Sequence, residues 1–193
     1  MIAIAAGWSL AQTSKPPSTD VEYYPLAVGN TWIYRVQPLE PTASSSTIKW
    51  RVGRVWESAK GRVYAVWPTP MEYDDEQLSL IVSPTGIEDI VDHYPLMKFP
   101  LKAGAKWSNP IKGTSFTEEF HVISVNRPCR ASRFRFSDCL EIEETDTKND
   151  TPQITTYARH VGPVSFHYFR VQGGKKILVQ TLELISYHLM SGR

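Results

Sequence analysis

The sequence lacks an excess of either charge, and it lacks an apolar run long enough to cross a bilayer as a helix. Its 21 Lys and Arg residues balance 20 Asp and Glu residues, so the formal net charge is +1. A chain with so little net charge has no global field that would attract nucleic acid or anionic lipid. A membrane-spanning helix needs about 20 mostly apolar residues, and the N-terminal apolar run, residues 2–10, is shorter. We therefore expect neither a nucleic-acid partner nor a membrane span.

The sequence also lacks the motifs that mark common catalytic and nucleotide-binding sites. It contains no G-x-S-x-G nucleophile elbow, no H-E-x-x-H zinc motif, no P-loop and no G-x-G-x-x-G. His160 and His167 flank one predicted hairpin, but a metal site would need a third ligand. The pattern therefore favours a protein that is not an enzyme, with no cofactor and no metal. The five histidines are scattered along the chain, at His93, His121, His160, His167 and His188.

Cysteine is scarce, with Cys129 and Cys139 alone. In an oxidising compartment these residues would form a disulfide, worth on the order of 2–3 kcal/mol in the chain-entropy model. A tight hairpin turn at residues 130–133, however, would place Cys139 opposite a residue near Ser124 rather than opposite Cys129. We therefore expect the bridge to require a wider loop. Neither cysteine has a nearby histidine suited to activating a thiolate, which argues against a catalytic role.

The N-terminal residues resemble the remains of an export signal. Residues 2–10 are uncharged, and Ser9-Leu10-Ala11 places small residues at the −3 and −1 positions before Gln12. The basic residues that usually precede such a run are missing, so either the signal starts upstream or the run is fortuitous. We expect residues 1–11 to be a signal peptide remnant and residues 12–22 to be a flexible leader. The mature protein is then exported, either periplasmic or secreted.

What the chain does have is a strong period of two. β-branched and aromatic residues alternate with polar residues over many short segments, which is typical of half-buried strands. Most of the 14 Pro and 11 Gly residues fall between these segments, where they favour turns. A change of phase at Gly53 predicts a β-bulge. The predicted strands cover residues 31–37, 48–55, 62–67, 78–82, 87–91, 116–125, 133–144, 155–160, 164–171 and 175–189.

A repeated frame indicates how these strands are organised. Tyr24-Pro-Leu-Ala-Val-Gly-Asn-Thr-Trp32 recurs 75 residues later as Phe99-Pro-Leu-Lys-Ala-Gly-Ala-Lys-Trp107. Two weaker matches follow in the same order, beginning at Thr47 and at Gln77. Ordered recurrence of this kind is typical of a duplicated structural unit. Chance recurrence of Pro, Gly and Trp at strand entries is the alternative.

We therefore predict one all-β domain over residues 23–193. It would consist of two tandem β units, about residues 23–95 and 98–170, followed by a C-terminal strand at residues 175–189. Antiparallel strands in this number form an open barrel, a roll or a sandwich.

Four segments carry a resemblance to a known group. These are the two repeated frames, Asp138-Cys-Leu-Glu-Ile-Glu143 and Tyr157-Ala-Arg-His-Val-Gly-Pro-Val164. They resemble exported bacterial proteins of unknown function, a group loosely similar to TapB-like domains, over most of residues 23–188. The resemblance implies an all-β exported domain without established catalytic residues. His160 departs from the group's pattern, in which a glycine often precedes Val-Gly.

The functional prediction is a non-enzymatic exported domain that binds an apolar ligand between its two units, or a cell-envelope protein. If the curved sheet is open on one face, Trp50, Trp67 and Phe120 would line a groove for the ligand; packing in the core is the alternative role for these three residues. An envelope hydrolase with an unfamiliar site is a second hypothesis. It would require a polar cluster such as His160, His167 and Glu143 in one cleft. A purely structural module is the third.

Overall fold

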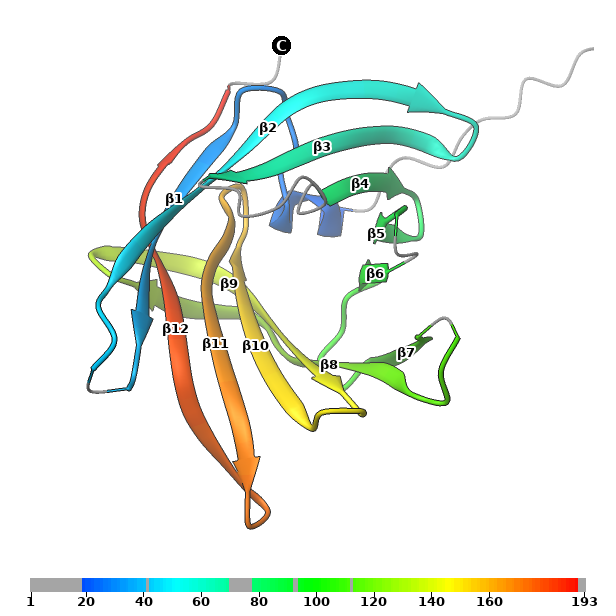
Figure 1. The fold of residues 1–193 in the computed structure, drawn as a ribbon. Coiled ribbons are helices and arrows are strands. Elements are labelled where there is room, and N and C mark those ends of the chain that lie inside the picture. The colour runs from blue at the N-terminus through cyan, green and yellow to red at the C-terminus, as the bar shows by residue number, and fades with distance from the viewer. Residues whose placement is uncertain (1–18, 41, 70–77, 92–93, 112, 191–193) are drawn as a thin grey trace, which may run out of the picture.

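The computed structural model describes residues 19–40, 42–69, 78–91, 94–111 and 113–190. Over these residues the chain forms a short 3-10 helix and twelve antiparallel strands, which curl into one nearly closed, barrel-like sheet (Figure 1). The prediction of an all-β antiparallel fold is confirmed, and of the three architectures considered, an open barrel, a roll or a sandwich, the sheet is barrel-like. The elements in chain order are η1 (Thr19–Tyr23), β1 (Thr31–Pro38), β2 (Ser46–Ser58), β3 (Gly61–Thr69), β4 (Leu78–Ser83), β5 (Gly86–Asp89), β6 (Tyr94–Lys98), β7 (Lys106–Pro110), β8 (Thr117–Ala131), β9 (Phe134–Asp146), β10 (Thr151–Ala158), β11 (Gly162–Gln172) and β12 (Lys175–His188).

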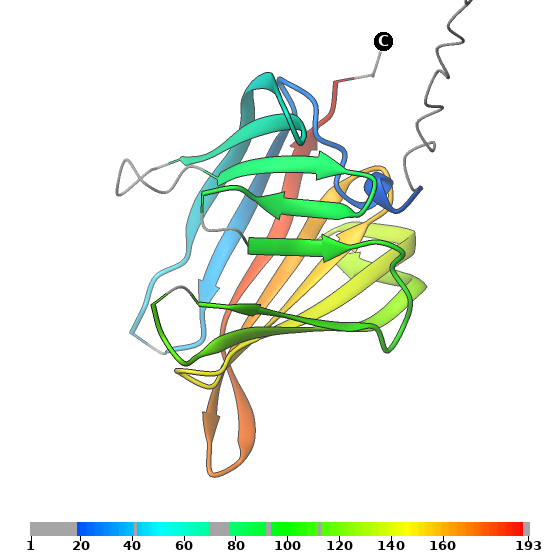
Figure 2. The ribbon, with the colours of Figure 1, turned by 90° about the vertical axis from the view of Figure 1, so that its right-hand side faces the viewer.

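The strands form a meander whose open edges lie in the middle of the chain rather than at its ends. Strands β1 to β6 pair in consecutive order, strands β7 to β12 do the same, and β1 pairs with β12. Thr31 of β1 thus lies opposite His188 of β12. The edge strands of the sheet are β6 and β7, which follow one another in sequence but are not paired (Figure 2). We call this interruption between β6 and β7 the seam.

The repeated frame has the same backbone hydrogen bonds in both places. The Gly29 N–H donates to the Val52 carbonyl oxygen at 2.8 Å, and the Gly104 N–H donates to the Val122 carbonyl oxygen at 2.8 Å. In each case the residue after the glycine accepts a hydrogen bond from the same valine at 2.9 Å. Both glycines have positive φ, 96° and 84°, a conformation that a residue with a Cβ rarely adopts. These matched contacts support our proposal that the chain contains two tandem units.

The core of the barrel contains several aromatic residues from the N-terminal part of the chain. Trp32 and Tyr34 of β1 are fully buried, as are Tyr23 and Tyr24 just before β1. The Trp32 indole N–H donates to the Val161 carbonyl oxygen at 2.6 Å. Burying an aromatic ring while satisfying its polar atom is favourable, so Trp32 stabilises the fold as a core residue.

The bulge predicted at Gly53 is confirmed. The pairing of β2 with β3 shifts register between Val52 and Arg54. The ring of Trp67 covers Gly53 so closely that a Cβ at this position would lie 1.4 Å from Trp67 Cζ3. A glycine is therefore required here for packing as well as for the local change of phase.

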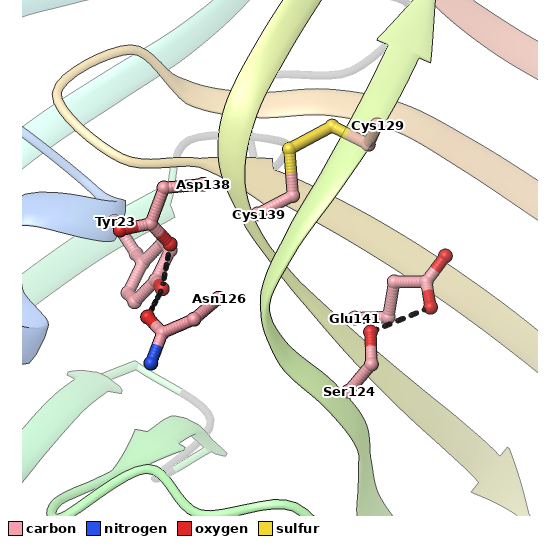
Figure 3. Close-up of a disulfide and its surroundings, with 7 residues drawn as sticks. All are labelled: Tyr23, Ser124, Asn126, Cys129, Asp138, Cys139 and Glu141. Atoms are coloured by element: carbon pink, nitrogen blue, oxygen red, sulfur yellow. Dashed lines mark hydrogen bonds between the residues drawn. A yellow bond between two sulfur atoms is a disulfide. The ribbon is translucent and has the colours of Figure 1, made fainter.

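Cys129 and Cys139 form a disulfide between β8 and β9, with their Cα atoms 6.0 Å apart (Figure 3). The expectation that this bridge needs a wide loop is wrong. The β8–β9 turn is tight, but it spans residues 131–134, one residue further along the chain than expected. Register shifts in β8 then bring Cys139 opposite Arg127 rather than Ser124. Cys129 is two residues from Arg127, so it is a diagonal neighbour of Cys139 within bridging distance.

The 3-10 helix η1 is docked against the barrel by an arginine. Arg159, in the turn after β10, forms ion pairs with Glu22 at 2.9 Å and with Asp138 at 2.6 Å. Its guanidinium carbon lies 4.5 Å from the ring centroid of Tyr23. The Tyr23 hydroxyl is 2.5 Å from Asp138 Oδ1, and burial together with this hydrogen bond raises the pKa of Tyr23 to about 12. One guanidinium thus ties the start of the described chain to β9.

This docking corrects the expected leader. Residues 19–22 were assigned to a flexible segment, but they form most of η1 and contact the barrel through Glu22. The predicted signal remnant, residues 1–11, and the rest of the expected leader, residues 12–18, lie outside the described residues. Within the part of the chain that the structure describes, no helix has the length and apolar character needed to cross a membrane.

Candidate functional site

The inner face of the curved sheet encloses a cavity of about 610 Å³. Ligand pockets in proteins usually measure about 300–1,000 Å³ and are mainly apolar, with a few polar groups. The apolar and aromatic residues of its wall are Tyr24, Trp50, Leu78, Tyr94, Leu96, Pro110, Ile111, Phe120, Ile142, Tyr157, Pro163, Phe166 and Tyr168. The polar residues are Asp89, Asn109, Glu118, Glu144, Gln153 and Thr155.

Strand register explains why these residues share one wall. Phe120, Glu144, Gln153 and Tyr168 lie opposite one another on β8, β9, β10 and β11. Paired residues on adjacent strands face the same side of a sheet, and every second residue returns to that side. The next inward row, two residues along each strand, therefore also lines the cavity, and it consists of Ile142, Thr155 and Phe166.

Aromatic rings pack against each other around the cavity. The ring centroids of Trp50 and Phe166 are 5.2 Å apart. On the other side, Tyr94 of β6 meets Phe120 of β8 edge-on, with centroids 5.3 Å apart. Such pairs hold the rings in fixed orientations, so the wall is preformed on at least two sides.

Two hydrogen-bond donors in this wall have no partner. The Tyr24 hydroxyl and the Trp50 indole N–H are buried, and neither forms a hydrogen bond to any of the described residues. Burial raises the pKa of Tyr24, with the carboxylate of Asp89 adding to the shift, so the hydroxyl keeps its proton and remains a donor. Leaving a buried donor unpaired costs roughly 1–3 kcal/mol. Both atoms have almost no accessible surface, so they lie within the wall rather than on the surface of the cavity.

Carboxylates lie in another part of the same wall. The Asn109 side chain donates to Glu118 Oε2 at 3.1 Å, and the Tyr94 hydroxyl forms a hydrogen bond with Glu144. Burial raises the pKa of Glu144, the carboxylates of Glu118 and Asp146 raise it further, and the bond from Tyr94 opposes the shift. The cavity thus combines aromatic surface with carboxylates.

The structure places two of the three predicted ligand-binding residues in this cavity. Trp50 and Phe120 line it. Trp67 does not line the cavity. It lies opposite Arg51 of β2, which is exposed on the outer face of the sheet, whereas Trp50, one residue earlier on β2, lies opposite Pro68 and faces the interior. The sequence pattern identified three aromatic residues in strands, but only strand register shows which face each one occupies.

The polar cluster required by the hydrolase hypothesis does not form. Glu143 lies opposite His121 on the outer face and contacts Lys176. His167 of β11 is two strands away from Glu143 of β9, with Ile154 of β10 between the two residues. The side chain of His160 is 69% exposed and lies in the turn beyond the end of β10, at least about 13 Å along the strand from the row of Ile154. Among the described residues, no group of three potential ligands could hold a metal ion.

Sequence reasoning did not single out Tyr24, Tyr94 or Glu118 as members of a site. A signal for Glu144 was present, because it has the same parity in β9 as Leu140 and Ile142, which are buried. A carboxylate on the apolar face of a strand is unusual in a core and therefore informative. No comparable pattern distinguishes Tyr24 from the other aromatic residues.

Comparison of the sequence with protein-family models and with curated proteins found no match. Among solved structures, the chain is similar to a protein from Bacteroides fragilis that is described as exported and as having a YmcC-like fold. The TM-score is 0.55 at 12% sequence identity, and the match covers 86% of this chain and 98% of that one. This likeness shows a shared fold.

A second solved structure is a protein from Parabacteroides distasonis that is described as a lipoprotein. Its TM-score is 0.45 at 11% identity, with 86% of this chain and 98% of that chain covered.

Proposed function

We propose that the protein is an exported, non-enzymatic β domain that binds a small amphipathic molecule in its interior cavity. The observation that carries this proposal is a cavity of about 610 Å³ whose wall is mainly aromatic and apolar, with a few polar groups. A ligand that packs an apolar body against the aromatic rings would remove that surface from water.

Three observations support export. The N-terminal residues 1–11 have the pattern of a signal peptide remnant. The disulfide between Cys129 and Cys139 is of a kind that persists in oxidising compartments. The Bacteroides fragilis protein with the same fold is also described as exported. A periplasmic or secreted binding domain accounts for all three.

Titration with the fluorescent ketone prodan tests the binding proposal. Prodan is neutral, has an apolar naphthalene body and carries one carbonyl acceptor. We expect it to bind the wild-type protein with a blue-shifted emission. Trp50→Leu and Phe166→Leu each remove an aromatic ring from the cavity wall, so each should weaken binding roughly fivefold, which corresponds to about 1 kcal/mol.

Trp67→Leu is the matched control, because Trp67 lies on the outer face of the sheet. This variant should bind prodan as the wild type does. The proposal would be wrong if prodan does not bind the wild-type protein, or if the two cavity variants and the control bind it equally well.

A further inference from the structure

The charge of the cavity wall carries information that the proposed function does not use. Among the described residues that line the cavity there are three carboxylates, Asp89, Glu118 and Glu144, and no Lys, Arg or His. The chain as a whole has almost no net charge. The cavity wall is therefore acidic although the chain is nearly neutral, and the burial of Glu144 strengthens the electrostatic interactions of its carboxylate.

Asp89 has a structural role that accounts for its burial. Its Oδ1 accepts a hydrogen bond from the Val91 N–H at 3.0 Å and lies 3.4 Å from the Ser79 nitrogen. It therefore stabilises the backbone where β5 ends. Glu118 and Glu144 supply the other two carboxylates of the wall, and they carry the argument.

Glu118 and Glu144 lie on adjacent strands and face the same interior. Glu118 of β8 is opposite Asp146 of β9, and Glu144 is two residues before Asp146 on the same face. Diagonal neighbours of this kind have their Cα atoms about 7–8 Å apart. That separation suits a single cation placed between two carboxylates, each of which would accept a hydrogen bond from it.

The pKa of Glu144 is raised, first by burial and further by the neighbouring carboxylates. An ionised Glu144 therefore destabilises the protein when no ligand is bound. Tyr94 and Phe120 supply aromatic surface beside the same carboxylates. Aromatic faces attract organic cations as well as apolar groups. An ammonium group bound here would be stabilised by the carboxylates and by the aromatic faces.

A pair of tyrosines lies toward the other end of the cavity. Tyr24 packs against Tyr157, with ring centroids 6.0 Å apart. Tyr157 is opposite Leu140 of β9, four residues from Glu144 and therefore about 13 Å from it along the strand. The cavity thus has an acidic end at Glu118 and Glu144 and an aromatic end at Tyr24 and Tyr157.

We propose that the cavity selects amphipathic molecules that carry a protonated amine, with the ammonium group held between Glu118 and Glu144 and the apolar body against the aromatic rings. This inference rests on the proposed function and adds the class of ligand. It predicts a clear order of affinity among molecules of the same shape and different charge.

Three naphthalene probes test this order by isothermal titration calorimetry at pH 7. They are 2-(aminomethyl)naphthalene, which is a cation, 2-(hydroxymethyl)naphthalene, which is neutral, and 2-naphthoate, which is an anion. We expect the amine to bind at least about tenfold more tightly than the alcohol, the difference that a charge-assisted hydrogen bond provides. The anion should bind least.

Glu144→Gln should abolish the preference for the amine while leaving the affinity for the alcohol within about twofold. Gln still accepts a hydrogen bond from Tyr94, so the local structure is retained. The matched control is Glu143→Gln, because Glu143 is the next residue along β9 and faces outward. This control should keep the wild-type preference.

The outcomes separate the two proposals. If the alcohol binds as tightly as the amine to the wild-type protein, the inference about charge is wrong, while the proposed cavity function stands. If neither these probes nor prodan binds, both are wrong. The comparison of probes on the wild-type protein does not depend on the folding of any variant.

Discussion

The indole N–H of Trp107 donates a hydrogen bond of 2.9 Å to the carbonyl oxygen of Pro95, and this bond joins β7 to β6 across the seam. The ring of Trp107 also stacks on Phe120 with centroids 5.1 Å apart, and Phe120 in turn contacts Tyr94 of β6. The barrel is therefore closed at the seam by side chains, whereas elsewhere it is closed by paired backbone.

Trp107→Phe should loosen the seam selectively. Phenylalanine keeps a ring against Phe120 but cannot donate to Pro95, so we expect a loss of about 1 kcal/mol in the free energy of unfolding. Hydrogen exchange measured by mass spectrometry should show faster exchange in β6 than in β1 or β12. Trp32→Phe is the control, because Trp32 also donates to a carbonyl but lies on β1, which is paired on both sides. Equal acceleration of β6 in both variants would contradict this prediction.

Glu144→Gln should stabilise the empty protein in a pH-dependent way. The folded-state pKa of Glu144 is raised above its ordinary value of 4.5, first by burial. Between that value and the raised pKa the folded state binds more protons than the unfolded state, so the wild type loses stability as the pH rises through this window.

The two proteins should therefore be equally stable below about pH 4.5, and the variant should have the higher melting temperature at pH 7. Thermal melts across pH 4–8 would test this. A variant that is less stable than the wild type at every pH would contradict the prediction. The titratable groups that face Glu144 are Tyr94, Glu118, Asp146, Tyr157 and Tyr168.

Removal of the disulfide should cost about 2–3 kcal/mol of unfolding free energy, since the bridge closes a loop with a sequence separation of 10. Urea denaturation of a Cys129→Ser, Cys139→Ser double variant would measure this loss. Reduction of the wild-type protein should produce a similar loss, and the reductant should have no effect on the double variant. A double variant as stable as the oxidised wild type would show that the bridge contributes little.

His160→Gly should stabilise the protein by up to about 1 kcal/mol, because His160 adopts a left-handed conformation with φ of 62°. Its backbone N–H donates to the Glu22 carbonyl oxygen at 2.7 Å, and glycine keeps that bond. His160→Ala should give no such gain, since alanine has the same steric cost at positive φ. Urea denaturation of the three proteins distinguishes the cases, and equal effects of Gly and Ala would contradict the conformational explanation.

Much of the fold followed from local sequence patterns. Period-two alternation predicted ten of the segments that pair in the sheet, and the turn at Ser83-Pro-Thr-Gly86 joins β4 to β5. The strands that escaped prediction, β6 and β7, are five residues each and contain a proline. Proline in a short run argues against a strand, except at a sheet edge, and the sequence alone did not show that these strands lie at edges.

The candidate site was less predictable because it depends on register. Trp50 and Trp67 look alike as aromatic residues in strands, yet they occupy opposite faces. The disulfide depended on register shifts in β8, which no local pattern indicated. Glu144 could have been noticed from its parity with Leu140 and Ile142, but its proximity to Tyr94 arises only when β6 approaches β9 across the interior.

The pairing of β1 with β12 has a consequence for folding kinetics. Every other strand pair in the described sheet joins strands that are consecutive in sequence. Thr31 of β1, by contrast, pairs with His188 of β12, near the end of the described chain. Contacts between distant segments form late, because the entropy of closing a long loop must be offset first. The cavity draws Trp50 from one half of the chain and Phe166 from the other. We therefore expect a growing polypeptide to remain unable to bind its ligand until β12 has been synthesised and has paired with β1.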